Sequence, residues 1–284
     1  MPAKVELSAS SPWFLHAMPA IVPRMGAGVK WVSYNPTNRS QGRPNSSALL
    51  ILNDMESGLP YCVLDALWAT YARTAACAIV AIRRLAAKLG TVALVGGGQM
   101  ATTILPYIDE SFPELERFEV VTRSEESARA FCDALAPRLH ATVRPARDVT
   151  QATAAADVVI SAIGDSAEPP LEEHHFRRGM LALPLDAETA WTTAALHLAD
   201  KSFADDPEVF ANGFRRRRPH DVPPAMTGGL ADVVAGNIAG REREDERILC
   251  SNNGIAILDV VLGAEIYRRA VAQGLGSPFP LTGD

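Results

Sequence analysis

A glycine-rich segment, Gly96-Gly97-Gly98-Gln99-Met100-Ala101, follows an apolar run at 91–95. In the pattern GxGxxA the first glycine permits a tight turn, the second lets the backbone approach a pyrophosphate, and the small last residue lets a helix pack on a strand. The free N–H groups of that helix then face the anion. The segment predicts dinucleotide binding by Gly96, Gly98, Gln99, Met100 and Ala101, with a plain glycine turn as the alternative.

The residues after the next predicted strand bear on the choice of cofactor. An acidic residue there binds the ribose 2′-hydroxyl of NAD. Here the strand ends in Val121-Thr122-Arg123-Ser124, with no acid. We therefore expect Thr122, Arg123 and Ser124 to meet a 2′-phosphate, so that NADP(H) is preferred and NAD(H) is the alternative. The other interpretation of Arg123 is a solvated loop residue.

Strands and helices alternate around these motifs. Apolar runs at 91–98, 118–122, 141–146, 157–163 and 180–185 predict strands, and 99–110 and 124–136 predict helices, the second with Ser124 as N-cap. Such alternation indicates βαβ units and a parallel sheet. We expect an α/β fold in which a Rossmann-type parallel-sheet domain, 90–215, is inserted in a second, α+β substrate and dimerisation domain formed by 1–89 and 216–284.

The flanking segments have a different pattern. We expect strands at 28–34 and 47–53, a turn at 55–60, a buried helix at 65–89 that ends before Gly90, and a long helix within 251–276. An Asn would cap this last helix and Gly274 would follow it. The runs 215–218 and 240–247 are charged, and we expect a solvated loop at the first and a surface loop or turn at the second. The apolar face of the last helix is expected to contain Ile255, Leu258, Val261, Leu262, Ile266 and Val271.

Composition excludes several classes of protein. With 48% apolar and 21% charged residues, the chain is neither disordered nor fibrous. Its 27 basic and 33 acidic residues argue against binding nucleic acid or a membrane surface. The four cysteines, Cys62, Cys77, Cys132 and Cys250, form no CxxC pair, so we expect neither a metal site nor disulfides. With no signal-peptide pattern, the expected location is cytoplasmic.

Several segments, taken together and in order, resemble the ornithine cyclodeaminase/mu-crystallin family of NAD(P)-dependent proteins. The resemblance covers nearly the whole chain. It rests on the glycine segment and on Met18–Ala20, Gly28–Trp31, Asn53–Asp54, Gly58–Pro60, Thr70, Arg73–Ala76, Ala199–Lys201, Asp205–Asp206, Gly240–Glu242 and Asn253–Ala256.

The resemblance implies roles for three residues. The family's active-site lysine falls on Lys30, and the arginine that binds the substrate carboxylate falls on Arg73. Its catalytic aspartate falls on Asp186, after the predicted strand 180–185. A carboxylate at the carboxyl end of a parallel strand points into the crevice and can move protons. The alternatives are a solvent-exposed lysine at a strand edge for Lys30, a structural ion pair for Arg73, and a helix cap or turn for Asp186.

The resemblance implies further contacts. Ser161, Ala162 and Ile163 would lie along the cofactor, and Asn253 and Gly254 would lie near the nicotinamide. The family also has an upstream arginine that binds the substrate carboxylate, and Lys4 is the nearest basic residue to its position. The family also has an N-terminal helical segment that helps to build a dimer, and we expect this chain to lack part of it. We still expect a homodimer.

The leading hypothesis is an oxidoreductase of amino acid metabolism that acts at the α-carbon of an amino or imino acid. Imine (ketimine) reductase, amino acid dehydrogenase and cyclodeaminase activities share the implied geometry, in which Lys30 and Arg73 hold the substrate and Asp186 manages the proton. The second hypothesis is a non-catalytic, crystallin-like protein that binds NADP(H) or a small ligand. Oxidation of NADPH in the presence of cyclic imines, or of 2-oxo acids with amines, distinguishes the two.

Overall fold

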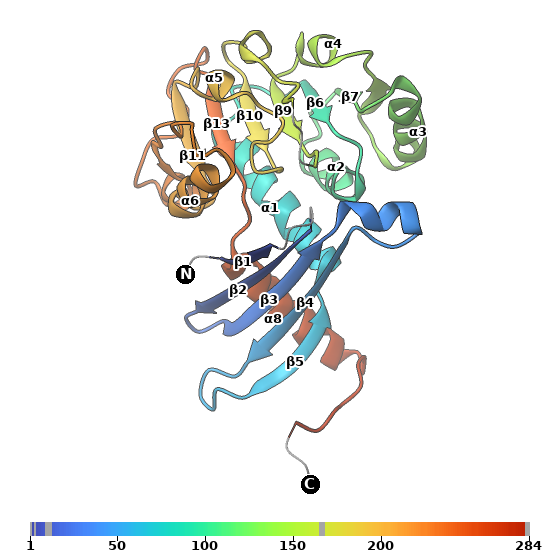
Figure 1. The fold of residues 1–284 in the computed structure, drawn as a ribbon, viewed down its shortest axis with the longest axis vertical. Helices are drawn as coiled ribbons and strands as arrows, with labels where there is room; N and C mark the ends of the chain where they lie inside the picture. Colours follow the sequence, from blue (N-terminus) through green and yellow to red (C-terminus); the bar gives the residue numbers. More distant parts are fainter. Residues whose placement is uncertain (1, 3, 9–12, 165–167, 282–284) are drawn as a thin grey trace. The chain divides into compact units, whose positions relative to one another are not determined.

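The computed structural model describes residues 2, 4–8, 13–164 and 168–281 (Figure 1). The chain divides into two compact units, Met1–Arg73 with Ile255–Asp284 and Thr74–Gly254. These bounds differ from the expected inserted domain, 90–215, because the second unit also includes 216–254 and most of the first long helix. In the part of the chain that the structure describes, no helix is long and apolar enough to cross a membrane.

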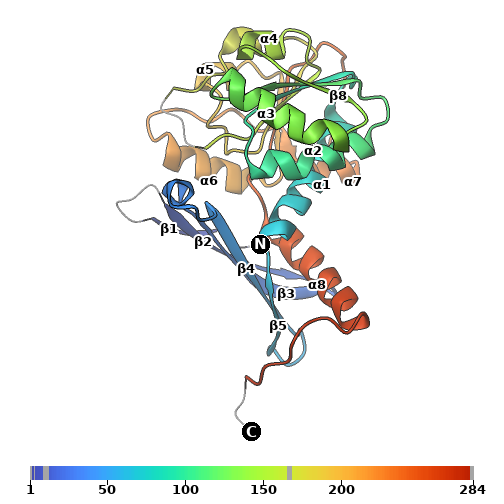
Figure 2. The same ribbon diagram turned by 90° about the vertical axis from the view of Figure 1, so that its right-hand side faces the viewer.

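The first unit is an antiparallel sheet with one long helix on it (Figure 2). The strands lie in chain order: β1 (Val5–Ser8), β2 (Phe14–Val22), β3 (Gly26–Tyr34), β4 (Ser46–Asn53) and β5 (Pro60–Asp65). A 3₁₀ helix, η1 (Pro36–Gln41), joins β3 to β4. The expected strands at 28–34 and 47–53 correspond to β3 and β4, whereas β2 and β5 were not predicted.

Helix α8 (Ala256–Ala272) packs on β2, β3 and β4 through small residues. Its buried positions are Ala256, Asp259, Val260 and Gly263, so the predicted apolar face was wrong. A Cβ atom at Gly263 would lie 2.2 Å from a methyl group of Leu50, so the backbone of α8 runs very close to the sheet. Ile255 is its N-cap residue and has no side-chain cap, so the expected Asn cap is also wrong.

The second unit has an eight-stranded sheet in which neighbouring strands pair in parallel (Figure 1). The order is β12 (Gly228–Gly229), β11 (Lys201–Ala204), β13 (Ile248–Ser251), β10 (Leu181–Pro184), β9 (Val158–Ser161), β6 (Thr91–Val95), β7 (Arg117–Val121) and β8 (Thr142–Pro145). The central strands are buried along their length, as in sheets covered on both faces. The predicted α/β, Rossmann-type fold with a second domain is confirmed.

Helices connect these strands. They are α1 (Leu67–Leu85), α2 (Gln99–Ser111), α3 (Glu125–Leu135), α4 (Val149–Thr153), α5 (Thr193–Leu196), α6 (Pro207–Arg217) and α7 (Leu230–Ala235), with 3₁₀ turns η2 (Ala136–Arg138) and η3 (Glu173–His175). Helix α1 ends at Leu85 instead of extending to residue 89, and the unit boundary falls within it. The Ser124 hydroxyl accepts from the backbone N–H of Ser127, which confirms Ser124 as the N-cap of α3.

Two charged segments expected to be solvated or surface loops are partly buried. The run 215–218 continues α6, and Arg218 donates to the carbonyls of Glu188 and Trp191. In 240–247, Arg241 donates to the carbonyls of Leu85 and Glu246. These side chains satisfy backbone carbonyls at the ends of other elements, and composition alone gives no sign of such partners.

Candidate active site

The glycine segment forms an open cradle between β6 and α2. Gly96 has φ of +118°, and a Cβ atom there would lie 2.4 Å from the carbonyl oxygen of Ala162. At Gly98, by contrast, a Cβ atom would meet nothing within 4 Å. Gly98 is also the N-cap of α2 and provides no side-chain acceptor for its first N–H groups. Space beside the backbone and unsatisfied N–H donors are what a pyrophosphate requires, so these residues fit a dinucleotide.

Three further residues of the glycine segment begin α2. Gln99, Met100 and Ala101 form its first turn, and Ala101 is fully buried against the sheet. This is the close helix–strand packing for which a small residue was expected.

The turn after β7 has three clustered hydroxyl groups, those of Thr122, Ser124 and Ser127. Thr122 Oγ1 contacts Ser127 Oγ and donates to the Ser124 carbonyl at 2.9 Å. The Arg123 side chain is exposed beside them. Ser127 was not predicted to belong to this group. Its position three residues after the N-cap is the signal that could have found it.

Asp186 follows β10 and is hydrogen-bonded on both carboxylate oxygens. Its Oδ1 accepts from Ser161 Oγ at 3.1 Å, and its Oδ2 accepts from the Ile163 N–H at 3.2 Å. Burial raises the pKa of Asp186 to about 7; the two hydrogen bonds lower it and the charge of Glu188 raises it further. The second unit therefore brings together three predicted site residues, Asp186, Ser161 and Ile163, around a carboxyl group that changes protonation near neutral pH.

Asn253 and Gly254 are fixed by two acidic residues that sequence reasoning missed as site residues. Asp205 accepts the N–H groups of Asn253 and Gly254 at 3.1 and 2.6 Å. The Asn253 side-chain amide donates to Glu188 Oε1 at 3.1 Å. Asp205 was part of the resemblance only as a motif residue, and no pattern in the sequence pointed to Glu188.

In the first unit, Lys30 and Arg73 share one acidic partner. Lys30, on the central strand β3, is 1% exposed, and its Nζ lies 2.7 Å from Asp259 Oδ2 on α8. Arg73 Nε lies 3.2 Å from Asp259 Oδ1. Lys30 is therefore not a solvent-exposed lysine, and Arg73 makes this contact through Nε and not through its terminal Nη groups. Asp259 was not predicted; an acidic residue on a helix face that packs on a sheet was the available signal.

The protonation of Lys30 is set by this surrounding charge. Burial lowers the pKa of Lys30 to about 7, the Arg73 charge lowers it as well, and the Asp259 carboxylate opposes both. The charge of Lys4 also lowers it, to a smaller extent. Of the predicted substrate-binding residues, Lys30, Arg73 and Lys4 are thus electrostatically coupled within one unit.

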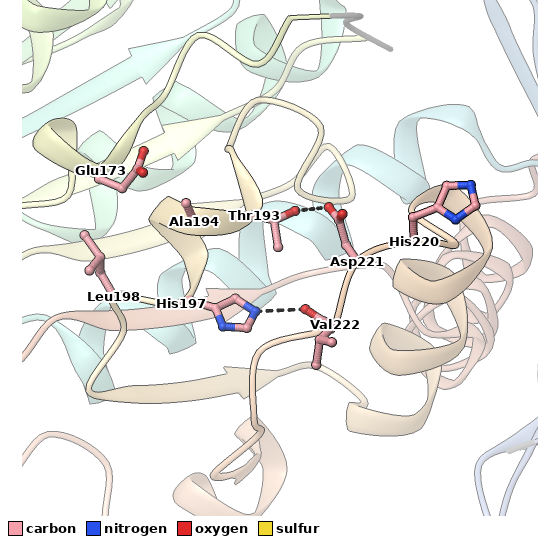
Figure 3. A pocket seen from close by; sticks show the side chains of 8 residues that line it. All are labelled: Glu173, Thr193, Ala194, His197, Leu198, His220, Asp221 and Val222. Atoms are coloured by element: carbon pink, nitrogen blue, oxygen red, sulfur yellow. Dashed lines mark hydrogen bonds between the residues drawn. The ribbon is translucent and has the colours of Figure 1, made fainter.

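A separate open cavity of about 570 Å³ lies beside α5 (Figure 3). His197 Nε2 lies 2.8 Å from the Val222 carbonyl, and Thr193 hydrogen-bonds Asp221. The lining contains no predicted site residue, so we assign it no part in the candidate site. It consists of Glu173, Thr193, Ala194, His197, Leu198, His220, Asp221 and Val222.

Known proteins resemble this chain over nearly its whole length. The protein NfeD, a nodulation efficiency protein of Rhizobium meliloti, is 30% identical over 97% of this chain and 86% of its own. A solved archaeal alanine dehydrogenase dimer with bound NAD is 27% identical, with a TM-score of 0.85 over 99% of this chain and 88% of that one. The Delta(1)-pyrroline-2-carboxylate reductase of Thermococcus litoralis, solved with NADH and L-proline, shares the fold, with 22% identity and a TM-score of 0.88 over 98% and 89% of the two chains.

A family model gives the same result. The model of the ornithine cyclodeaminase/mu-crystallin family matches residues 1–274. This match confirms the resemblance that the glycine segment, Lys30, Arg73 and Asn253–Ala256 first indicated. The chain belongs to the ornithine cyclodeaminase/mu-crystallin family.

Proposed function

We propose that this protein is an NAD(P)-dependent oxidoreductase that acts at the α-carbon of an amino or imino acid, by imine reduction, amino acid dehydrogenation or cyclodeamination. The observation that carries the proposal is Asp186, a carboxyl group with a pKa of about 7 in the same unit as an open glycine cradle. The names of relatives, among them alanine dehydrogenase and pyrroline-carboxylate reductase, support it.

In this proposal the residues divide cofactor binding, substrate binding and proton transfer among them. The cradle at Gly96 and Gly98 would hold the pyrophosphate, and the nicotinamide would supply or accept the hydride. Arg73 and Lys30 bind the substrate carboxylate, with Lys4 adding positive charge. Asp186 gives a proton to the reacting nitrogen or takes one from it, and Lys30 is the second candidate for that task.

The test is a substrate panel with both reduced cofactors. Cyclic imines, and 2-oxo acids with ammonia or amines, are incubated with NADPH or NADH, and loss of absorbance is followed. L-Ornithine, L-lysine and L-alanine are incubated with NAD or NADP in the other direction. Turnover of one carboxylate-bearing substrate supports the proposal. Cofactor binding without turnover on any of them favours the non-catalytic ligand-binding alternative.

Arg73→Ala is expected to raise KM for the substrate about 10- to 100-fold, with a smaller effect on kcat. The reason is that a charge-assisted contact to a carboxylate contributes roughly 1.5–3 kcal/mol. Steady-state kinetics with the substrate that the panel identifies measures this change in KM, with Arg73→Lys as the charge-conserving control. A loss of kcat at unchanged KM would contradict the assignment.

Arg123→Ala is expected to narrow a preference for NADPH over NADH. In this proposal the exposed guanidinium beside Thr122 and Ser124 binds the 2′-phosphate of NADPH, which NADH lacks. Fluorescence titration of both cofactors on wild type and variant measures the ratio, with Arg129→Ala on α3 as a control. Equal or tighter binding of NADH by the wild-type protein would refute the preference.

We further propose that the protein is a homodimer that pairs through the sheet of the first unit. The face opposite α8 exposes a row of apolar side chains, and register places them together, since Trp31 pairs with Leu49 and Ile51 with Val63. A contiguous apolar face of this kind marks an interface. The solved archaeal alanine dehydrogenase is a dimer, which favours a second copy as the occupant.

Leu49→Glu is expected to convert the dimer into a monomer, because it sets a charge in the middle of this apolar face. Light scattering at micromolar concentration measures the mass. Val222→Glu, at an exposed apolar residue of the second unit, is the matched control and should stay dimeric. A monomeric wild-type protein would contradict the proposal.

A further inference from the structure

Glu188 is a buried carboxylate without a role in the mechanism above. It lies two residues after Asp186 and is 0% exposed. Ala187 and Glu188 have φ of 58° and 64°, a left-handed conformation that residues other than glycine rarely adopt. The surrounding contacts must therefore hold this turn in place.

Those contacts come from three elements. Arg217, at the end of α6, donates to Glu188 Oε2 at 2.9 Å. Ser251, at the end of β13, hydrogen-bonds Oε1, and so does the Asn253 amide. Arg218 donates to the Glu188 carbonyl at 2.8 Å. The side chain and the backbone of Glu188 are thus both anchored, and the turn that begins at Asp186 is anchored with them.

The Asn253 side chain is held in one orientation. Its Nδ2 atom donates to Glu188 Oε1 and, at 2.9 Å, to Ser251 Oγ. With Nδ2 committed to these acceptors, the direction of Oδ1 is fixed. Asp205 holds the backbone of the same residue, so two carboxylates set the position of Asn253.

We propose that Glu188 is a positioning residue that fixes the Asn253 side chain and holds the turn that carries Asp186. This role rests on the proposed function, because it takes Asn253 as a neighbour of the nicotinamide and Asp186 as the group that moves the proton. The charge of Glu188 also raises the pKa of Asp186, which couples the same residue to proton transfer.

The test compares ligands with and without the nicotinamide. NADPH and NADH are titrated against wild type, Glu188→Gln, Asn253→Ala and the double variant, beside ADP-ribose and its 2′-phosphate. Each single variant should weaken binding of the reduced cofactors about three- to tenfold, the range expected for one lost hydrogen bond, and leave binding of the ADP-ribose ligands unchanged. The double variant should be no weaker than the worse single variant, because Glu188 acts through Asn253. Glu208→Gln, an exposed glutamate on α6, is the control.

Other results overturn the role. Equal weakening of both ligand types would show a merely structural residue, and additive losses would show that Glu188 does not act through Asn253. If Glu188→Gln does not fold, Asn253→Asp probes the same contact by setting a second carboxylate against Glu188. It should bind NADPH more weakly than Asn253→Ala, and equal affinities would refute the contact. If the wild-type protein binds none of these ligands, the proposed function fails and this role fails with it.

Discussion

Asp186→Asn is expected to keep the affinity for reduced cofactor and to lose about 10²- to 10⁴-fold in turnover, the usual cost of removing a positioned general acid or base. The substitution is nearly isosteric and retains one acceptor for Ser161 Oγ or the Ile163 N–H. Cofactor binding depends on the cradle at Gly98 instead. Gly98→Val is therefore the complementary control. It should lose cofactor binding, since the valine side chain fills space that is open in the wild-type protein.

The pH dependence of turnover follows from the pKa of Asp186, which is about 7. Imine reduction needs the protonated acid, so its rate should fall as pH rises through about 7. Amino acid oxidation needs the ionised base, so its rate should rise over the same interval. The pH profile of kcat measures both trends. If Asp186→Asn turned over as fast as the wild-type protein, the proton-transfer role would pass to Lys30.

Stability gives an independent check on the same group. An Asp that titrates at 3.8 when unfolded and near 7 when folded binds more protons in the native state between those values. The free energy of unfolding should therefore fall as pH rises from about 4 to 7, through this residue. Asp186→Asn should remove that slope, which urea unfolding at several pH values measures.

Local patterns in the sequence predicted the elements of the second unit best. The strand at 91–95, the glycine turn and the Ser124 cap are each specified by neighbours in sequence. The domain bounds depended instead on β13, a four-residue strand that pairs with β10 and β11. A strand this short gives no periodic pattern in the sequence, and its partners lie far away in the chain. The sequence interpretation therefore assigned 216–254 to the other domain.

The candidate site residues were predicted mainly from the family resemblance. Lys30, Arg73 and Asp186 came from the family resemblance, and the structure places each next to a charged or hydrogen-bonding partner. Asp259, the shared partner of Lys30 and Arg73, was missed because it lies far from both in sequence. Glu188 was missed for another reason: its left-handed turn contains none of the glycine or asparagine residues that signal one.

Asp259→Ala is expected to lower the free energy of unfolding by about 3–5 kcal/mol, the cost of breaking a buried ion pair by removing one partner. Asp259 is 1% exposed and neutralises two cations, Lys30 and Arg73. Its removal takes away the carboxylate that favours the charged form of Lys30, and it leaves Arg73 without this partner on the packed side of the sheet. Urea unfolding measures the change.

The Lys30→Met change separates charge from packing. Alone, Lys30→Met should lower the free energy of unfolding much less than Asp259→Ala does. Asp259 keeps its contact with Arg73, and the variant no longer has to bury an ammonium group. Combined with Asp259→Ala it should recover part of the stability, since the buried amine that lost its partner is removed as well. Additive losses in the double variant would show that α8 packing, and not the shared charge, sets the cost.

The pH dependence supplies the last check on this pair. The pKa of Lys30 is lowered from 10.5 to about 7, so between those values the unfolded chain binds more protons than the folded one. The free energy of unfolding should therefore rise with pH from about 7 to 10.5 through this residue. Lys30→Met should abolish that rise, whereas Lys88→Met, at an exposed lysine, should not. If the wild-type slope persists in Lys30→Met, Lys30 stays charged in the folded protein. A permanently charged Lys30 could bind the substrate carboxylate, as Arg73 does, but could not replace Asp186 in moving the proton.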